Sequence, residues 1–401
     1  MPDGAAAEAI TSAVAAERTT IVASLIRLTG DWGLAEDCVQ DAVEKALLRW
    51  PTDGLPRSPA AWLTTAARNR ALDILRRRTT ERTKLAELAI EQDRDDSGPE
   101  PDDRLRLIFT CCHPAIALDN RVALTLRTVA GLSMAEVARA LLVPEATMSQ
   151  RLLRTKAKIA NAGIPYRVPP DELLAERTAG VLAVVYLIFN EGYRQVDDHL
   201  AVEAQRLARL LVELMPDADE PRGLLALITL QLARRATRFD ADGELVPMEE
   251  QDRSRWDAEA VDEARRQLRR AGASGRPAGA YRLQALIAEC HATARDSDAT
   301  PWATIVHLYD ALLVVHPSPV VALNRAIAVG FRDGWTAGLA ELDAVDARRL
   351  ASYYLLPAAR ADFLRRLGRA AEAAREYRIA ADLAPPGGPE QRLLQRRVAT
   401  L

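Results

Sequence analysis

The sequence predicts an all-α protein built from several helical modules, and three observations support this prediction. Hydrophobic residues make up 49% of the 401 residues and charged residues 27%, whereas aromatic residues make up only 5%. This composition is typical of soluble helical proteins and excludes collagen-like, disulfide-stapled and mostly disordered chains. Apolar residues recur at helical spacing over most of the chain, and no strand-like alternation of convincing length occurs. The length corresponds to two or three domains.

The amino terminus and the cysteines indicate a protein of the reducing cytoplasm. Residues 1–20 carry Asp3 and Glu8 and lack a basic segment ahead of an apolar core, so no signal peptide is expected. No run approaches the roughly 18 apolar residues that a membrane span needs, so no membrane partner is expected. The chain has four cysteines, too few for a disulfide framework in a chain of this length. They are Cys38, Cys111, Cys112 and Cys290.

Charge is distributed in blocks that the total conceals. The net charge of −3 argues against a simple cationic nucleic-acid binder. Over residues 57–84, however, eight basic residues oppose two acidic ones, a net charge of +6, and over 104–168 ten oppose three, a net charge of +7. Between them, residues 91–103 hold seven acidic residues and one basic, a net charge of −6. Two basic modules joined by an acidic, flexible linker are therefore expected.

The first module is predicted to contain two helices connected by a proline-rich loop. Residues 34–50 place apolar side chains on one helical stripe. This stripe consists of Leu34, Cys38, Ala42 or Val43, Ala46 and Leu47. A loop with three prolines and a glycine follows, and Pro59 suits the first turn of the second helix. That helix ends with Arg76, Arg77 and Arg78, whose charge complements its carboxyl end.

Residues 121–159 carry the clearest local signal, a helix-turn-helix. A first helix stops at Gly131, and Ser133 with Glu136 forms a capping box for a short helix over 134–141. A turn over 142–144 opens a third helix from 145 to about 159. Its inward residues are expected to be Met148, Leu152, Leu153 and Ile159. Its outer face is polar near the start and cationic later, which suits base-edge contacts followed by phosphate contacts.

These segments together resemble the extracytoplasmic-function sigma factors of bacterial RNA polymerase. Residues 35–42 (AEDCVQDA) are similar to the family's A-E-D-x-V-Q-[DE] signature, and residues 59–73 (PAAWLTTAARNRALD) resemble its A-W-L-x-x-I-A-R-N-x-A-x-D helix. The helix-turn-helix resembles the module that reads the −35 promoter element. Order, spacing and acidic linker agree over residues 18–159. The resemblance implies a chain that binds promoter DNA and core RNA polymerase, through the β′ clamp helices and the β flap.

The resemblance assigns two surfaces in the first module. One polar face would meet the clamp helices and contains Glu36, Asp37, Gln40, Asp41 and Glu44. The other would open and capture −10 DNA and contains Arg57, Trp62, Arg68, Asn69, Arg70, Arg76, Arg77 and Arg78. Within it, Asn69 would contact an extruded base, the arginines would hold phosphates, and the loop over 54–58 would form the base pocket. Trp62 is also read as core packing, because a large aromatic residue at helical spacing usually is.

The resemblance assigns −35 binding to the third helix of the helix-turn-helix. The residues are Thr147, Ser149, Gln150, Arg151, Arg154, Lys156 and Lys158. The family's usual G-T-V-x-S-R turn reads ATMSQR here, so Gln150 replaces a serine. Glutamine pairs bidentately with adenine, so a different −35 specificity is expected. An ordinary helical hairpin with a solvated basic face is the alternative interpretation of this segment.

The carboxyl half indicates helical repeats. Tyr309 and Tyr377 are 68 residues apart, and Gly334 and Gly368 are 34 apart, which is the tetratricopeptide period. About three units are expected near 283–317, 318–351 and 352–385, with coincidental helix pairs as the alternative. Together with residues 108–114 (IFTCCHP), this half resembles a sigma-factor subgroup that carries a tetratricopeptide-like extension.

The cysteine and histidine residues do not predict a cofactor, a metal site or an active site. Cys111, Cys112 and His113 could suggest a zinc site. Adjacent cysteines cannot easily present both thiolates to one zinc ion, however, so the two cysteine side chains are expected to pack in the protein interior. The chain has no phosphate-binding glycine loop and no nucleophile elbow, and its five histidines are scattered. Glu289, His291 and Asp296 are expected on a helical surface. No enzyme is predicted.

The sequence thus predicts four parts and one function. The parts are a region-two-like module at 1–85, an acidic linker at 86–103, a region-four-like module at 104–168 and a helical extension at 169–401 with repeats near 283–385. The function is an alternative sigma factor whose extension regulates it by packing on the DNA-binding modules or by receiving a regulatory protein or ligand. A standalone helix-turn-helix regulator with a repeat-based sensor domain is the alternative.

Overall fold

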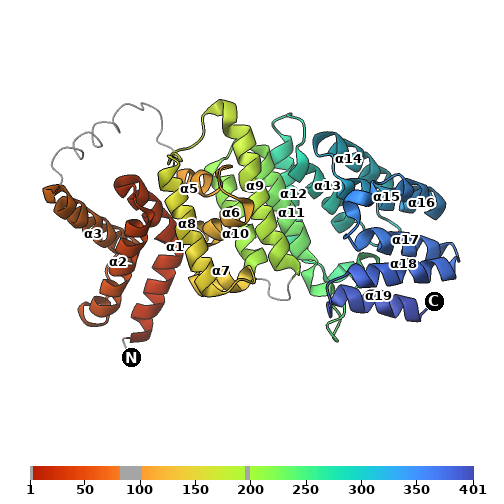
Figure 1. Ribbon diagram of the computed structural model, residues 1–401, viewed down its shortest axis with the longest axis horizontal. Helices are drawn as coiled ribbons and strands as arrows, with labels where there is room; N and C mark the ends of the chain where they lie inside the picture. The colour runs from red at the N-terminus through yellow and green to blue at the C-terminus, as the bar shows by residue number, and fades with distance from the viewer. Residues whose placement is uncertain (1–2, 82–101, 195–198) are drawn as a thin grey trace. The chain divides into compact units, whose positions relative to one another are not determined.

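A computed structural model describes residues 3–81, 102–194 and 199–401 of the chain (Figure 1). The described residues form helices, and their extended pairing is limited to an isolated antiparallel bridge between Phe239 and Leu245. The expected all-α class is confirmed. The chain divides into two compact units, one through Leu207 and one from Ala208. The expected linker at 86–103 lies outside the described residues except for its last two positions.

The first unit begins with three packed helices, α1 (Asp3–Thr29), α2 (Trp32–Asp53) and α3 (Pro59–Glu81). The carboxylate of Asp31 caps α2 by accepting from the backbone N–H of Leu34 at 3.1 Å. Gly54, with φ of +83°, ends α2, and Pro59 begins α3 as predicted. The expected place of Leu47 on the buried stripe is wrong, because the stripe passes through Ala46 to the buried Trp50 and leaves Leu47 half exposed.

The segment that contains the predicted helix-turn-helix follows in the same unit. It consists of α5 (Asp103–Cys111), α6 (Leu118–Leu124), the π-helical turn η1 (Thr125–Val129), α7 (Met134–Ala140) and α8 (Glu145–Asn161). The predicted capping box is present: the Ser133 hydroxyl accepts from the Glu136 N–H at 3.2 Å, and the Glu136 carboxylate accepts from the Ser133 N–H at 2.7 Å. These bonds lower the pKa of Glu136. The expectation that Leu153 points inward is wrong, because Thr155 takes the buried position and Leu153 is 63% exposed.

Two further helices complete the first unit, α9 (Asp171–Arg194) and α10 (His199–Leu214), the latter extending past Leu207. Helix α9 packs against α5 and α6, and Arg177 donates to the carbonyl of Phe109 at 3.2 Å. The compact unit therefore extends beyond residue 168, where the sequence placed the end of the region-four-like module. Gly192 of α9 lies against Leu200 and Ala201 of α10, with no room for a side chain.

The second unit consists of successive helix pairs. Its first helices are α11 (Asp219–Ala233), α12 (Ala258–Gly272), α13 (Ala280–Thr293) and α14 (Trp302–Val315), with short helices η2 (Arg235–Thr237), η3 (Met248–Glu250) and η4 (Arg253–Arg255) between α11 and α12. It continues with α15 (Pro319–Asp333), α16 (Trp335–Asp343), η5 (Ala347–Leu350), α17 (Leu355–Arg366), α18 (Ala370–Leu383) and α19 (Pro389–Ala399). The pairs α13–α14, α15–α16 and α17–α18 coincide closely with the three units expected from the 34-residue spacing.

A loop between α11 and α12 is tied to the carboxyl-terminal helices of the second unit. Glu244 lies 2.7 Å from Arg392 and 2.9 Å from Arg396, and Glu249 and Glu250 pair with Arg366 and Arg397. The residue run 251–256 organises this loop: Gln251 donates to the carbonyl of Val246 at 2.9 Å, and the Trp256 indole donates to Thr237 at 2.9 Å. These side chains are engaged in packing and internal hydrogen bonds.

Candidate polymerase and nucleic-acid interface

Helix α2 presents the acidic face that the sequence singled out. Asp37, Gln40 and Glu44 are exposed, and the Gln40 amide donates to Glu44 at 3.2 Å. Cys38, Val39 and Ala42 are buried behind them against α1 and α3. The helix therefore positions a polar stripe on a firmly packed base, as required for binding the basic surface of another protein.

Two of the α2 carboxylates are already paired within the first unit. Asp41 accepts from Arg70 of α3 at 2.6 Å, and both side chains are 36% exposed. Glu36 accepts from Lys156 of α8 at 2.8 Å, and these side chains are only 16% and 19% exposed. Sequence reasoning assigned each of these four residues to an external partner. It missed both pairs because ion pairs between distant helices leave no periodic signal in the sequence.

Helix α3 carries the residues expected to bind −10 DNA. Arg68 and Asn69 are exposed, as are Arg76 and Arg77, while Arg70 is half-buried on Asp41. Arg57 is exposed in the loop that precedes α3. The side chain of Arg78 lies outside the described residues. An exposed asparagine is thus flanked by arginines on both sides, an arrangement suited to a base edge and its phosphates.

Trp62 sits at the junction of α2 and α3. Its ring packs edge-on against that of Trp50, with centroids 5.5 Å apart and an interplanar angle of 76°. Trp50 is buried and Trp62 half-buried. This geometry is the favourable T-shaped arrangement, so Trp62 fixes the start of α3 on α2 while part of its ring stays accessible to solvent.

Helix α8 presents a mixed polar and cationic face. Its exposed residues include Thr147, Ser149, Gln150, Arg154 and Lys158, and Arg151 is half-buried. Met148, Leu152, Thr155 and Ile159 are buried and hold the helix on the rest of the module. The exposed face begins with hydroxyl and amide groups and ends with cations, as the sequence predicted.

The two lysines of α8 point in different directions. Residues two positions apart on a helix project roughly 200° apart around its axis. Lys158 donates to the carbonyl of Ala115 at 2.5 Å on the exposed flank, whereas Lys156 faces α2 and pairs with Glu36. The structure therefore places Lys156 away from the exposed face on which Arg154 and Gln150 lie.

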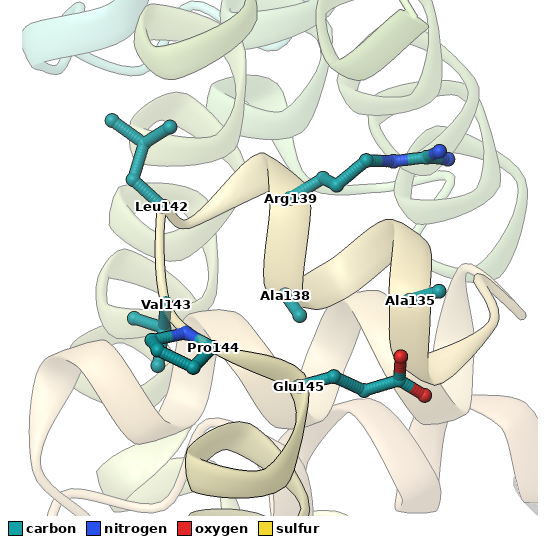
Figure 2. Close-up of a pocket in the computed structure, with 7 residues that line it drawn as sticks. All are labelled: Ala135, Ala138, Arg139, Leu142, Val143, Pro144 and Glu145. Carbon is teal, nitrogen blue, oxygen red and sulfur yellow. The ribbon is translucent and has the colours of Figure 1, made fainter.

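The turn between α7 and α8 borders an open hollow, drawn in Figure 2. Leu142 has a φ of +52°, unusual for a residue with a side chain, and is 82% exposed. Its side chain projects away from the turn. The hollow is lined by Ala135, Ala138, Arg139, Leu142, Val143, Pro144 and Glu145.

Cys111 and Cys112 are buried, and His113 makes an internal hydrogen bond. Both thiols are buried, and the sulfur of Cys112 lies 3.6 Å from the Thr125 hydroxyl. Burial raises the pKa of Cys112 to about 11. His113 accepts from the backbone N–H of Ala115 at 3.2 Å. Among the described residues, no group of three or more His, Cys, Asp or Glu side chains is placed to hold a metal ion.

Glu289, Asp296 and His291, which were expected on a helical surface, make contacts within the second unit. Glu289 pairs with Arg265 at 3.2 Å, and Asp296 accepts from the N–H of Ala299 at 2.8 Å. The expectation that His291 lies on an open surface is wrong, because its ring packs edge-on against Trp302 with centroids 5.3 Å apart.

No helix in the described ranges is long and apolar enough to cross a membrane.

Comparison with family models finds three matches along the chain. Residues 13–81 match sigma-70 region 2, and residues 106–159 match sigma-70 region 4. Residues 177–272 match a family of unknown function, DUF6596. The first two matches cover α2, α3 and the helix-turn-helix, in the order that the sequence predicted.

Comparison with known proteins finds relatives of two kinds. An uncharacterised protein of Rhizobium meliloti is 42% identical over 377 residues, which cover 90% of this chain and 88% of that protein. A probable ECF RNA polymerase sigma factor SigI of Mycobacterium tuberculosis is 28% identical over 171 residues, which cover 41% of this chain and 58% of that protein. No solved structure matches the chain.

Proposed function

We propose that the chain, whose residues 13–81 and 106–159 match sigma-70 regions 2 and 4, is an alternative sigma factor of the extracytoplasmic-function type, with a separate surface for each of its partners. Helix α2 binds the polymerase core, α3 captures −10 DNA, and α8 reads the −35 element. The observation that carries this proposal is that one unit presents an acidic helix face and two separate cationic ones. The chemistry of RNA synthesis belongs to the polymerase, so the chain acts as its specificity subunit.

The proposed organisation has four parts. Residues 1–85 form the region-two module, 86–103 the acidic linker, 104–168 the region-four module and 169–401 the extension. The net charges of +6 and +7 over 57–84 and 104–168 support two DNA-facing modules, and −6 over 91–103 supports a linker that DNA repels.

Polymerase binding is assigned to the exposed carboxylates of α2. Asp37 and Glu44 lie two turns apart on one face, with Gln40 between them, so a basic helix of the β′ clamp can lie along them. Charged rims of this kind chiefly raise the association rate and fix the orientation of a complex. The buried Cys38, Val39 and Ala42 keep the face rigid. Binding of the polymerase β flap is assigned to the region-four module.

Capture of −10 DNA is assigned to the start and middle of α3. Asn69 offers an amide that both donates and accepts, which suits one base edge, while Arg68 and Arg76 neutralise flanking phosphates. Extruding a base costs a few kcal/mol of stacking, which contacts of this kind offset. Arg57 places a cation on the loop before α3, where an extruded base would lie.

Reading of −35 DNA is assigned to the exposed face of α8. Gln150 is exposed near the amino end of the helix, where recognition helices contact bases, and its amide pairs with N6 and N7 of adenine. Arg154 and Lys158 follow on the same face, where they meet phosphates. Ser149 lies on the flank, so its contact is to the backbone or to an adjacent base.

The extension is proposed to regulate promoter binding. The helix pairs α13–α14, α15–α16 and α17–α18 support a tetratricopeptide-like repeat unit, and such stacks present surfaces for proteins or ligands. A chain ending at residue 216 keeps α9 and α10 whole and removes this unit. We expect it to retain polymerase binding and to change promoter-directed transcription. Unchanged transcription and unchanged response to growth conditions would remove the regulatory role.

Binding to core polymerase in the absence of DNA tests the main assignment. The full chain should co-purify with core polymerase, and the Asp37→Lys/Glu44→Lys variant should not. The Glu172→Lys/Glu176→Lys variant is the matched control, because it makes the same charge change on exposed positions of another helix, α9. A chain that binds promoter duplex alone and ignores polymerase would instead be a standalone helix-turn-helix regulator.

A further inference from the structure

The connection between α11 and α12 in the second unit is long and strongly acidic. It runs over residues 234–257 and contains the short helices η2, η3 and η4. Residues 240–252 hold six acidic residues and no basic one, a net charge of −6. Connections between packed helices are typically about two to eight residues long, and much longer ones usually have a function of their own. The packing of α11 on α12 therefore does not account for this loop.

The acidic loop binds a basic surface formed by α17 and α19, and Figure 1 shows it beside α19. Residues 347–401 hold eleven basic and five acidic residues, a net charge of +6. Arg392 and Arg396 of α19 lie 2.7 and 2.9 Å from Glu244. Arg397 pairs with Glu250 of the loop. We call the basic site the set of four arginines Arg366, Arg392, Arg396 and Arg397.

Arg366 is held in place by α17 and by two aromatic rings. Its guanidinium lies 4.4 Å from the ring centroid of Trp335 and 5.4 Å from that of Phe331. Asp362, one turn earlier on α17, accepts from its Nε at 2.7 Å. Its Nη2 donates to Glu249 of the loop at 2.6 Å. Because the rings and Asp362 position the guanidinium without the loop, Arg366 is prepared to bind a carboxylate from another source.

The arginines of α19 hold the loop by contacts that solvent weakens. The side chains of Arg392 and Arg396 are 43% and 48% exposed, and that of Glu250 is 51% exposed. Oε2 of Glu244 is buried, yet its contact with Arg396 lacks hydrogen-bond geometry. Ion pairs with such exposed partners contribute little to stability. A second ligand that carries the same charges can therefore compete for the basic site.

The base of the loop is fixed independently of its acidic segment. The indole of Trp256 donates to the Thr237 hydroxyl at 2.9 Å, and Trp256 is buried. The N–H of Asp257 donates to the carbonyl of Ala233 at 2.9 Å. These bonds join the two ends of the loop and do not involve the basic site. The carboxylates can therefore leave the basic site while α11 and α12 stay folded.

We propose that the basic site is a docking surface for an acidic, extended segment of a partner protein, and that the loop occupies this surface as an internal substitute. The loop indicates the pattern that the site accepts, one carboxylate at Glu244 and two more at Glu249 and Glu250. Residues 245–248 between them are apolar and half-buried, a feature that the phosphate backbone of a nucleic acid would not reproduce. The inference deepens the regulatory role proposed for the extension and rests on it.

Docking of a partner exchanges one set of carboxylates for another. The tethered loop competes at an effective concentration that is roughly millimolar for a short connection. A partner segment therefore needs contacts beyond those of the loop, and its binding releases residues 240–250 to solvent. The release supplies a change in the second unit that reports the presence of the partner.

The test uses the full-length chain and a fluorescein-labelled synthetic peptide of residues 240–252 as the probe. Fluorescence anisotropy should show weak binding to the unmodified chain, because its own loop competes. Glu244→Gln/Glu249→Gln removes charges from that competitor and should raise the affinity for the peptide about tenfold. Glu172→Gln/Glu176→Gln is the matched control, because it makes the same change at exposed positions of α9 and should leave the affinity unchanged.

A charge exchange tests the arginines themselves. Arg392→Glu/Arg397→Glu, added to the loop variant, should abolish binding of the acidic peptide. The same variant should bind a peptide in which lysine replaces all three glutamates, which a misfolded chain would not do. Raising the salt concentration should weaken both complexes, because the paired charges are exposed. Thermal unfolding confirms that each variant is folded.

Two results would overturn the docking surface. One is equal peptide affinity for the unmodified chain and for Glu244→Gln/Glu249→Gln, or peptide binding that the arginine exchange leaves intact. The other is displacement of the peptide by a single-stranded oligonucleotide at lower concentrations than by unlabelled peptide, which would assign the basic site to nucleic acid. Because the assay contains neither polymerase nor promoter, its failure leaves the proposed sigma-factor role standing, and failure of that role leaves the peptide result interpretable.

Discussion

Arg70 of α3 donates from Nε to the carboxylate of Asp41 at 2.6 Å, so a residue assigned to DNA and one assigned to polymerase neutralise each other. The pair bridges α2 and α3 where their two assigned surfaces meet. Since both side chains are about one-third exposed, solvent screens the pair and its contribution to folding is small. The pair therefore lies between the surface proposed to bind polymerase on α2 and the surface proposed to capture DNA on α3.

The first prediction concerns this pair. Arg70→Ala should lower the free energy of unfolding by less than about 1 kcal/mol, because exposed ion pairs contribute little. It should nevertheless weaken binding of single-stranded −10 DNA by the polymerase-bound chain. Arg68→Ala should weaken DNA binding similarly without changing stability. Urea unfolding and fluorescence anisotropy measure the two effects; a loss of several kcal/mol on Arg70→Ala would show a purely structural pair.

The second prediction separates base contacts from phosphate contacts on α8. Gln150→Ala should lower discrimination at one −35 position by about 1–3 kcal/mol. Arg154→Ala should weaken −35 binding, and Lys158→Ala should weaken binding to all sequences equally and reduce the salt dependence by about one phosphate contact. Arg167→Ala, an exposed change beyond α8, is the control. Equal changes in base preference from Gln150→Ala and Lys158→Ala would contradict the assigned face.

The third prediction compares two glycines of α9. A Cβ atom at Gly192 would lie 2.3 Å from the backbone nitrogen of Ala201, whereas one at Gly180 would meet nothing within 4 Å. Gly192→Ala should therefore destabilise the first unit by about 1–3 kcal/mol through overpacking. Gly180→Ala should stabilise it by about 0.5–1 kcal/mol, because alanine favours the helix. Equal unfolding midpoints for both variants would exclude the close approach of α9 and α10.

The fourth prediction is a pH dependence of stability in the second unit. Burial, reinforced by Arg253 and Arg234, lowers the pKa of His291 to about 4. The unfolded chain, with a histidine pKa of about 6.5, binds more protons between these values, so stability falls as pH drops from about 6.5 to 4. The loss amounts to about 3 kcal/mol when the shift is fully expressed.

The measurement for His291 is urea unfolding, followed by tryptophan fluorescence at several pH values. His291→Phe keeps an aromatic ring against Trp302 and should flatten the pH profile in this window. His307→Phe, at an exposed position on α14, should leave the profile as it is in the unmodified chain. Parallel profiles for the unmodified chain and His291→Phe would show that this imidazole is not buried uncharged.

Much of the fold could be predicted because local signals and tertiary packing agree. Ser133 and Glu136 form the capping box that the sequence indicated, and Pro59 begins α3. The spacing of Gly334 and Gly368 matches the turns that separate α15 from α16 and α17 from α18. Both glycines have positive φ, of +98° and +76°, which explains their position at these turns.

The misplaced side chains show where periodicity is insufficient. A leucine beside the buried stripe of a helix, such as Leu47 or Leu153, is assigned to the core on hydrophobicity alone, although both side chains are exposed. Thr155 is buried instead, with its hydroxyl donating to the carbonyl of Arg151 at 2.8 Å. Such local bonding lets a threonine occupy a core position that its polarity argues against.

The candidate site was predictable in its residue types and not in its pairings. Exposure of Asp37, Asn69 and Gln150 follows from helical spacing, whereas the contact of Glu36 with Lys156 joins residues 120 positions apart. No local pattern encodes such a contact. Contacts within each unit are equally distant from local patterns: Gly192 packs against α10, and Gln251 and Trp256 hydrogen-bond within the loop between α11 and α12.

Run-off transcription with purified core polymerase tests the central claim most directly. Fragmented genomic DNA from the source organism serves as template, and RNA 5′ ends are sequenced with and without the purified chain. A promoter-specific sigma factor should produce new, discrete start sites that share −10 and −35 sequences and that disappear with Asn69→Ala and Arg154→Ala. A pattern of start sites that the chain leaves unchanged, at concentrations where it binds polymerase, would contradict this role.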